Sequence, residues 1–269
     1  MCLVRTHRGC YNGSRTRLPD RLDKARPRTM DLQTETQRLL GQIKAQADPP
    51  YQGVIQRSIP SPLQVYGLRV WQIRQIVRAW RREHRDVSID DLLPLVEALW
   101  AGESREERLI ALELPQHYPF ALSQLIWEHF DRWRRDLDNW ELTDVLGVGV
   151  LGPWVAASIE RREQHLWHLV QDQDIWSRRL GLVSIVGLNR ARAGVDLTSL
   201  GLGLIDQVKE QPDRTMTRAI SWVLRELGKE HPGEVAAYLE ANVDLLPKQV
   251  LREVTNKLTT GRKDGSRKK

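Results

Sequence analysis

The chain has 269 residues, of which 41% are hydrophobic and 28% are charged, with a formal net charge of +6. The longest largely apolar run, residues 145–159, is interrupted by glycines and a proline and is shorter than the ~20 residues that cross a bilayer, so a membrane span is excluded. Both cysteines, Cys2 and Cys10, lie near the start, which excludes a disulfide framework and a cysteine-ligated zinc site elsewhere.

The positive charge is concentrated at the two ends of the chain. Residues 1–30 carry eight basic and two acidic side chains, residues 257–269 carry six and one, and residues 31–256 carry 27 and 32. Because residues 1–30 and 259–269 show no hydrophobic periodicity, we expect both segments to be disordered basic tails. Met30 directly precedes the first periodic segment and is a candidate for the true start. The N-terminal arginines are not followed by the apolar segment of a secretory signal, so a cytoplasmic location is expected.

Between the tails, hydrophobic residues recur with helical spacing over 31–258, and no stretch alternates as a half-buried strand does. Ser88 with Asp91, and Ser104 with Glu107, have the spacing of helix-starting capping boxes. The predicted class is all-α. The expected helices cover residues 31–46, 71–84, 89–101, 104–117, 121–136, 139–151, 153–171, 174–188, 196–210, 214–230, 232–243 and 247–258.

An arginine leads into an apolar helix at three places, Arg108, Arg179 and Arg218. The steps of 71 and 39 residues correspond to two periods of about 36 and one of 39, which is a spacing typical of helix-pair repeats. We therefore expect residues 31–258 to form one domain, a HEAT-like α-solenoid of antiparallel helix pairs with a concave surface.

Metal and cofactor sites find little support. His165 and His168 stand three residues apart on one expected helix, with Asp172 a turn beyond, but this spacing matches no ligand motif. A surface or packing role is the better interpretation of both histidines. No glycine-rich phosphate loop or serine nucleophile motif is present either, so no metal and no cofactor are predicted.

An indole and a carboxylate share one helix face in the segment Asn139-Trp-Glu-Leu-Thr-Asp144. Trp140 and Asp144 are four residues apart, hence one turn apart on the same face. The pair is either a capped surface pair, or an aromatic wall beside a charge that points into a groove.

Two later helices carry matching residue types. Arg178 and Arg179 are adjacent at the start of an apolar helix, so one of them should point along the concave face. Trp222 and Arg225 are three residues apart and share a face. Stacked as successive repeats, these helices would bring Arg179 and Trp222 into one groove with the indole and carboxylate of the earlier helix.

These segments resemble the DNA alkylation repair glycosylases of the AlkD type. The similarity covers about residues 60–258 and implies HEAT-like repeats and excision of positively charged N3- and N7-alkylpurines from DNA. The segments that carry it are Asn139-Trp-Glu-Leu-Thr-Asp144, Trp176-Ser-Arg-Arg179, Ala219-Ile-Ser-Trp-Val-Leu-Arg-Glu226, Tyr66-Gly-Leu-Arg-Val70 and Leu99-Trp-Ala-Gly-Glu-Ser-Arg105.

Carried over by position, the resemblance places the family's catalytic aspartate at Asp144 and its groove tryptophans at Trp140 and Trp222. It places the phosphate-contacting arginine at Arg179 and a further basic DNA contact at Arg225.

Near Gly67 the match to the family loosens, because Arg69 and the two residues after it occupy a turn where the family often has polar residues before a proline. Arg69 and Arg74 are therefore candidate phosphate contacts, as is Arg178. The implied partner is double-stranded DNA that contains alkylated purines, bound by a monomer.

The implied chemistry suits these residue types. A purine alkylated at N3 or N7 is already cationic and leaves without a general acid, so one carboxylate can suffice where glycosidases use two. That carboxylate would stabilise an oxocarbenium-like sugar and orient water. The resemblance also implies catalysis without base flipping, unlike most base-processing enzymes. Two alternatives stay open: a non-catalytic HEAT-repeat protein that binds damaged or distorted DNA, and a HEAT-type protein–protein scaffold.

Overall fold

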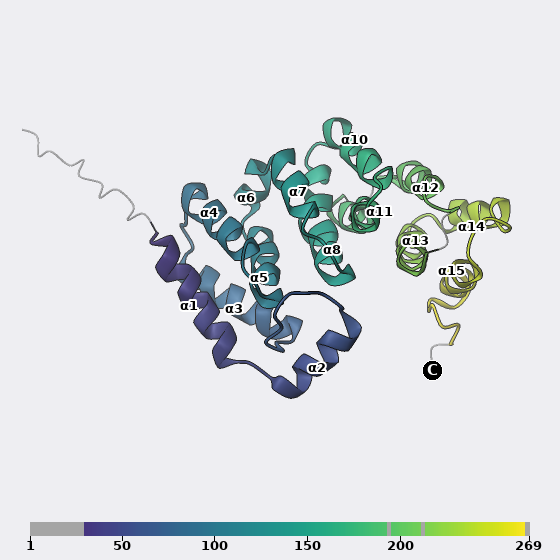
Figure 1. Ribbon diagram of the computed structural model, residues 1–269. Coiled ribbons are helices and arrows are strands. Elements are labelled where there is room, and N and C mark those ends of the chain that lie inside the picture. Colours follow the sequence, from purple (N-terminus) through teal and green to yellow (C-terminus); the bar gives the residue numbers. More distant parts are fainter. Residues whose placement is uncertain (1–29, 193–194, 211–212, 267–269) are drawn as a thin grey trace, which may run out of the picture. The chain divides into compact units, whose positions relative to one another are not determined.

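The computed structural model describes residues 30–192, 195–210 and 213–266, and every regular element in these ranges is helical (Figure 1). The predicted all-α class is confirmed, since an isolated bridge between Gln64 and Ser104 is the only β pairing there. The expected tail over 1–30 lies outside the described residues apart from Met30, and so do residues 267–269. Within the described part, no helix is long and apolar enough to cross a membrane.

One row of helices carries almost all of the candidate site residues. Each member packs against the next, and only Arg69 among the candidates lies just before a helix of the row rather than on it. The row consists of α3 (Val70–Glu83), α5 (Arg105–Gln116), α8 (Trp140–Leu146), α11 (Ile175–Ala191), α13 (Arg214–Leu227) and α15 (Lys248–Thr260).

A second row packs against the first along the chain. Its members are α4 (Ile89–Trp100), α6 (Pro119–Gln124), α9 (Gly152–Ala156), α10 (Ile159–Val170), α12 (Thr198–Asp206) and α14 (Pro232–Ala241). Helix α1 (Leu32–Ala45) packs on α3, α4 and α5, and α7 (Trp127–Arg134) contacts α11. Large apolar side chains such as Trp80, Phe130 and Trp133 are fully buried in the core.

Side-chain hydrogen bonds repeatedly join residues 36 positions apart in the sequence. Trp100 donates to Asp136 at 2.9 Å, and Arg81 donates to the His117 carbonyl at 2.9 Å, each across that separation. Two rows of helices tied at a constant sequence separation are what stacked helix pairs would give. The curvature and the concave groove stay predictions.

Two expected helices are each interrupted. The helix expected over 121–136 is divided into α6 and α7, because Leu125 is extended and its carbonyl accepts a hydrogen bond from the Trp154 indole at 2.8 Å. The helix expected over 153–171 is divided into α9 and α10 at Ala157 and Ser158, where the Trp154 carbonyl accepts from Arg162 instead. In both places a side chain satisfies a carbonyl near the break, from 29 residues away at Leu125 and from eight residues away at Trp154.

Helix α2 (Pro49–Ser58) was not expected from the sequence. It begins with a recognisable signal, because the Asp48 side chain accepts from the Tyr51 amide and a proline occupies the first turn. The helix expected over 139–151 continues from α8 into a π-helical turn, η1 (Gly147–Leu151). At the other end, α15 extends two residues beyond the expected boundary at 258 and ends at Gly261, which has a positive φ of 75°.

Candidate active site

The segment that follows α8 is held close to α11 by glycines on both sides of the contact. A Cβ atom on Gly152 would lie 2.5 Å from a backbone oxygen of α11, and one on Gly187 would lie 2.3 Å from a backbone oxygen of η1. Because no side chain fits at either position, the segment that follows α8 lies directly on α11. This close approach brings Asp144 on α8 against Arg179 on α11.

Asp144 and Arg179 form a bidentate ion pair. Arg179 Nε donates to one carboxylate oxygen of Asp144 at 2.8 Å, and Nη2 donates to the other at 2.9 Å. Nη1 donates to the carbonyl of Thr215 on α13 at 2.7 Å. The Arg179 side chain is 6% exposed and that of Asp144 is 16% exposed. The guanidinium therefore fixes the orientation of a carboxylate that keeps some contact with solvent.

Burial raises the pKa of Asp144 above that of an ordinary aspartate. The hydrogen bonds and the positive charge of Arg179 act in the opposite direction, and the negative charge of Glu141 adds to the rise. Burial thus disfavours the charged form of this carboxylate, and the buried Arg179 favours it.

The environment of Arg179 differs from that of an exposed phosphate contact. Three of its donor groups are already bonded to Asp144 and Thr215, and its side chain is almost fully buried. In this structure it is placed to position the carboxylate, and a direct phosphate contact stays a prediction.

Glu141, three residues before Asp144, does not approach the site as a second acid. Its two carboxylate oxygens each accept from Arg105 at 2.6 Å, and both side chains are buried.

A cavity of about 230 Å³ lies beside Asp144. It brings together three of the predicted site residues, Asp144, Trp222 and Arg74, from α8, α13 and α3. The residues that line it are Arg74, Glu113, Gln116, Asp144, Val145, Val148, Gly149, Arg190 and Trp222. We call this cavity the Asp144 pocket.

Charged residues that the sequence analysis did not single out also line the Asp144 pocket. Glu113 of α5 is buried and accepts from Arg74 at 3.0 Å. Arg190 at the end of α11 lies 3.4 Å from Glu226 of α13. Glu113 had a signal in the sequence, since an acidic residue inside the apolar run 109–114 needs a partner once its helix is buried.

The two predicted tryptophans lie in different settings. Trp222 is half-buried and lines the Asp144 pocket. Trp140 lies one turn before Asp144 on α8 but is not part of the pocket lining, and it is 39% exposed. Its indole N–H donates to the Ser58 carbonyl at the end of α2, at 3.1 Å. Helix α2 therefore supports the exposed indole from the side.

The remaining predicted DNA contacts lie outside the pocket lining. Arg69 pairs with Asp48 at 3.0 Å and stacks over Tyr51 at 4.2 Å, so it holds the start of α2. Arg225 is half-buried, and burial lowers the pKa of its guanidinium. Arg178 is half-buried, and its Nε is buried without a hydrogen-bond partner within the described ranges.

Within the described residues, no group of three or more His, Cys, Asp or Glu side chains is placed to hold a metal ion. His165 instead stacks on Trp127 at 4.1 Å, and His168 meets the same indole edge-on at 6.3 Å. Burial lowers the pKa of His165, which favours the neutral ring in this aromatic cluster. The positions of both histidines fit the packing role that the sequence favoured.

Solved structures share this fold. A predicted DNA alkylation repair enzyme from Enterococcus faecalis superposes with a TM-score of 0.67 at 18% identity, covering 80% of this chain and 97% of the other. The structure of smu.31 from Streptococcus mutans UA159 superposes with a TM-score of 0.51 at 13% identity, covering 69% of this chain and 97% of the other. The protein therefore has the all-helical fold of that predicted repair enzyme.

The sequence itself identifies the family. The model of the DNA alkylation repair enzyme family matches residues 39–258, so the chain belongs to this family. No curated protein is significantly similar to the chain. Family membership assigns the protein a role in the repair of alkylation damage, with DNA as its substrate.

Proposed function

We propose that the protein is a DNA glycosylase that hydrolyses the N-glycosidic bond of positively charged N3- and N7-alkylpurines in duplex DNA, acting as a monomer. The observation that carries this proposal is the carboxylate of Asp144, which Arg179 holds at the edge of a pocket also lined by Trp222. The chain's place in a DNA alkylation repair family supplies the class of substrate.

The charges around the pocket suit departure of a base that is already cationic. As the glycosidic bond breaks, the alkylated purine leaves as a neutral molecule and positive charge develops on the deoxyribose. A fixed carboxylate stabilises that charge without reorganising, and it orients a water molecule for attack on the sugar carbon. The water gives the sugar its new hydroxyl group and releases a proton, which the carboxylate can accept before solvent removes it.

Neither of the other nearby carboxylates is placed as an evident proton donor to a leaving base. Glu141 is bound by both of its oxygens to Arg105, and Glu113 is paired with Arg74. A neutral base needs protonation to leave, whereas a cationic base does not. The arrangement therefore favours cationic lesions.

The size of the pocket supports catalysis without extrusion of the base. Its volume of about 230 Å³ is below the ~300–1,000 Å³ of pockets that enclose small molecules, so it suits part of a sugar and a water better than a flipped nucleotide. The face of Trp222 can pack against the sugar and favours positive charge close to it.

The decisive experiment is release of bases from defined duplexes. We expect release of 7-methylguanine or 3-methyladenine, and release of uracil, hypoxanthine or 8-oxoguanine slower by about 10²–10⁴, the usual contribution of general acid assistance. Equal release of the neutral bases would contradict the proposed chemistry, and Glu113 and Glu141 would be the first residues to test as acids.

Controls separate this proposal from the two alternatives. A salt-dependent gel shift with wild-type protein tests duplex binding, which a protein–protein scaffold lacks. Duplex binding with no release of any alkylated base would leave the non-catalytic DNA-binding protein as the better description. Glu160→Gln, on an exposed residue of α10, is a matched carboxylate variant that should release bases at the wild-type rate.

A further inference from the structure

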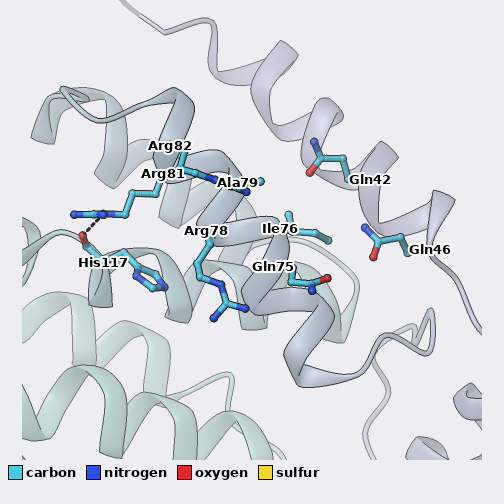
Figure 2. Close-up of a pocket in the computed structure, with 9 residues that line it drawn as sticks. All are labelled: Gln42, Gln46, Gln75, Ile76, Arg78, Ala79, Arg81, Arg82 and His117. Atoms are coloured by element: carbon cyan, nitrogen blue, oxygen red, sulfur yellow. Dashed lines mark hydrogen bonds between the residues drawn. The ribbon is translucent and has the colours of Figure 1, made fainter.

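A second cavity, of about 710 Å³, lies between α1, α3 and the C-terminal end of α5 (Figure 2). Its cationic side chains are those of Arg78, Arg81 and Arg82 on α3, and none of its lining residues, all of which are described, carries a carboxylate. We call it the α3 arginine pocket. The residues that line it are Gln42, Gln46, Gln75, Ile76, Arg78, Ala79, Arg81, Arg82 and His117.

The three arginines differ from their neighbours in having no ion-pair partner among the described residues. Arg74, one turn earlier on α3, pairs with a buried carboxylate. Arg81 donates from Nε to the His117 carbonyl at 2.9 Å, and Figure 2 shows this bond beside the outward side chains of Arg78 and Arg82. Like charges three and four residues apart on one helix destabilise it, so an anion bound here would relieve their repulsion.

The α3 arginine pocket adjoins the Asp144 pocket. Arg74 lines the Asp144 pocket, and Arg78, one turn later on the same helix, lines the arginine pocket. At the C-terminal end of α5, Gln116 lines the Asp144 pocket, and the next residue, His117, lines the arginine pocket. The two cavities therefore lie next to each other along α3 and along the C-terminal end of α5.

His117, which lines the α3 arginine pocket, is influenced by arginines from both cavities. Burial lowers the pKa of His117, Glu113 raises it, and Arg81, Arg78 and Arg74 each lower it further. The three guanidinium groups thus act together on one point between the two cavities.

Resting on the glycosylase function proposed above, we propose that the α3 arginine pocket binds backbone phosphates of one DNA strand, on one side of the lesion. Arginines at 74, 78 and 82 follow one another at steps of about 6 Å along α3. Phosphates on one strand advance about 3.4 Å each along the duplex axis. A step of about 6 Å covers nearly two phosphates, so where α3 runs along the duplex axis the row of guanidinium groups can meet alternate phosphates of one strand.

The residue types around the arginines suit a phosphodiester. Arginine presents paired N–H donors that match phosphate oxygens, and glutamine amides can donate to the same oxygens. Ile76 and Ala79 are the apolar lining residues, and the other seven side chains are polar or charged. Contacts to backbone phosphates carry no sequence information, so the contribution of this pocket should be independent of sequence.

The test is the salt dependence of duplex binding, measured by fluorescence anisotropy on undamaged DNA. The variant is Arg78→Gln with Arg82→Gln, which removes two charges from exposed side chains while keeping polar ones. Each lost phosphate contact lowers the slope of log affinity against log salt by about 0.9, so the double variant should lose about two units. Arg161→Gln, an exposed arginine on α10, is the matched control and should leave the slope unchanged.

A second substrate locates the contact. In a duplex with neutral methylphosphonate linkages on one side of a 7-methylguanine, the wild type should lose the same two units of slope. The double variant should be insensitive to the linkages, because the partners of the neutralised phosphates are already absent.

The outcomes distinguish this inference from the proposed function. Wild-type slope in the double variant, with base release intact, overturns the phosphate assignment and leaves the glycosylase proposal standing. Inorganic phosphate binding that the double variant loses, with no change in the DNA slope, identifies a free-anion site and also overturns the assignment. A wild-type protein that binds duplex but releases no base refutes the glycosylase, and the slopes still decide whether this pocket binds DNA.

Discussion

Two carboxylates on helix α8, three residues apart, are each held by an arginine about one repeat away, yet only Asp144 lines a described pocket. Glu141 pairs with Arg105, 36 residues before it, and Asp144 pairs with Arg179, 35 residues after it. Both pairs are bidentate. Glu141 is 9% exposed and lines neither described pocket, whereas Asp144 is 16% exposed and lines the pocket with Trp222.

An ion pair alone therefore does not distinguish the proposed catalytic residue from a structural one. Arg105 also donates to Glu106, whose carboxylate accepts from the backbone of Gly67 and Leu68. That network therefore fixes the entrance to α3 and is structural. The Asp144 pair ends at a cavity, so its carboxylate can meet a substrate. Substitutions in the two pairs should accordingly separate stability from catalysis.

The largest effect is expected from Arg105→Ala. It leaves the buried carboxylates of Glu141 and Glu106 without their cation, and breaking a buried pair in this way costs about 3–5 kcal/mol of unfolding free energy. Urea unfolding followed by circular dichroism measures it. The control is Arg132→Ala, which breaks an exposed pair with Glu97 and should cost at most ~1 kcal/mol. Equal losses in the two variants would contradict the structural role of the Arg105 network.

Asp144→Asn should abolish most base release while keeping duplex binding. The amide keeps the shape of the side chain but loses the charge that opposes the oxocarbenium ion, so the rate should fall by about 10²–10³, or ~2.7–4 kcal/mol. Single-turnover release of 7-methylguanine measures this. Glu141→Gln is the matched comparison on the same helix, and its correctly folded fraction should react at the wild-type rate. Near-normal release by Asp144→Asn would remove Asp144 from the mechanism.

Arg179→Lys should have an intermediate effect and should change the pH profile. Lysine keeps the charge but cannot hold both oxygens, and a lost hydrogen bond to a charged group of about 1.5 kcal/mol corresponds to about a tenfold slower reaction. Catalysis needs the carboxylate form, so activity falls as pH drops through the pKa of Asp144. Burial raises that pKa and Arg179 opposes the rise, so the variant should lose activity at a higher pH than the wild type.

A second variant, Arg179→Ala, tests the assignment of Arg179 itself. If Arg179 only positions Asp144, the salt dependence of duplex binding should be unchanged in Arg179→Ala. A slope lower by about one unit would instead establish the phosphate contact that the family resemblance implies.

The smallest effect is expected from Trp140→Phe. It keeps an aromatic ring beside the site but removes the hydrogen bond from the indole to the Ser58 carbonyl, at a cost of about 0.5–1.5 kcal/mol in stability. Thermal unfolding measures it. The comparison is Trp71→Phe, whose indole is 53% exposed and makes no hydrogen bond within the described residues, and which should be neutral. A loss in Trp71→Phe as large as in Trp140→Phe would show that the Ser58 contact is not responsible.

Local sequence signals determined most of the helices and part of the site. The capping box of Ser104 and Glu107 forms as its spacing predicts, since both hydrogen bonds lie within one turn. Trp140 and Asp144 both lie on α8, about one turn apart, because an α-helix has about 3.6 residues per turn. The Asp48 and proline signal at the start of α2 was equally local and was missed, although the N-cap hydrogen bond is present.

Tertiary structure alone decided which charges meet. The partner of Asp144 lies 35 residues away, and the partner of Glu113 lies 39 residues away on a neighbouring helix. Helical periodicity relates residues only within a few turns, so it could place Arg179 on a helix but could not show that its donors are bonded to Asp144 and to the Thr215 carbonyl. The break near Leu125 has the same origin, since its carbonyl accepts from Trp154, 29 residues away. The sequence alone therefore specified the helices, whereas packing between repeats specified the pocket, because buried charges and carbonyls take the partners that the stacked helices bring to them.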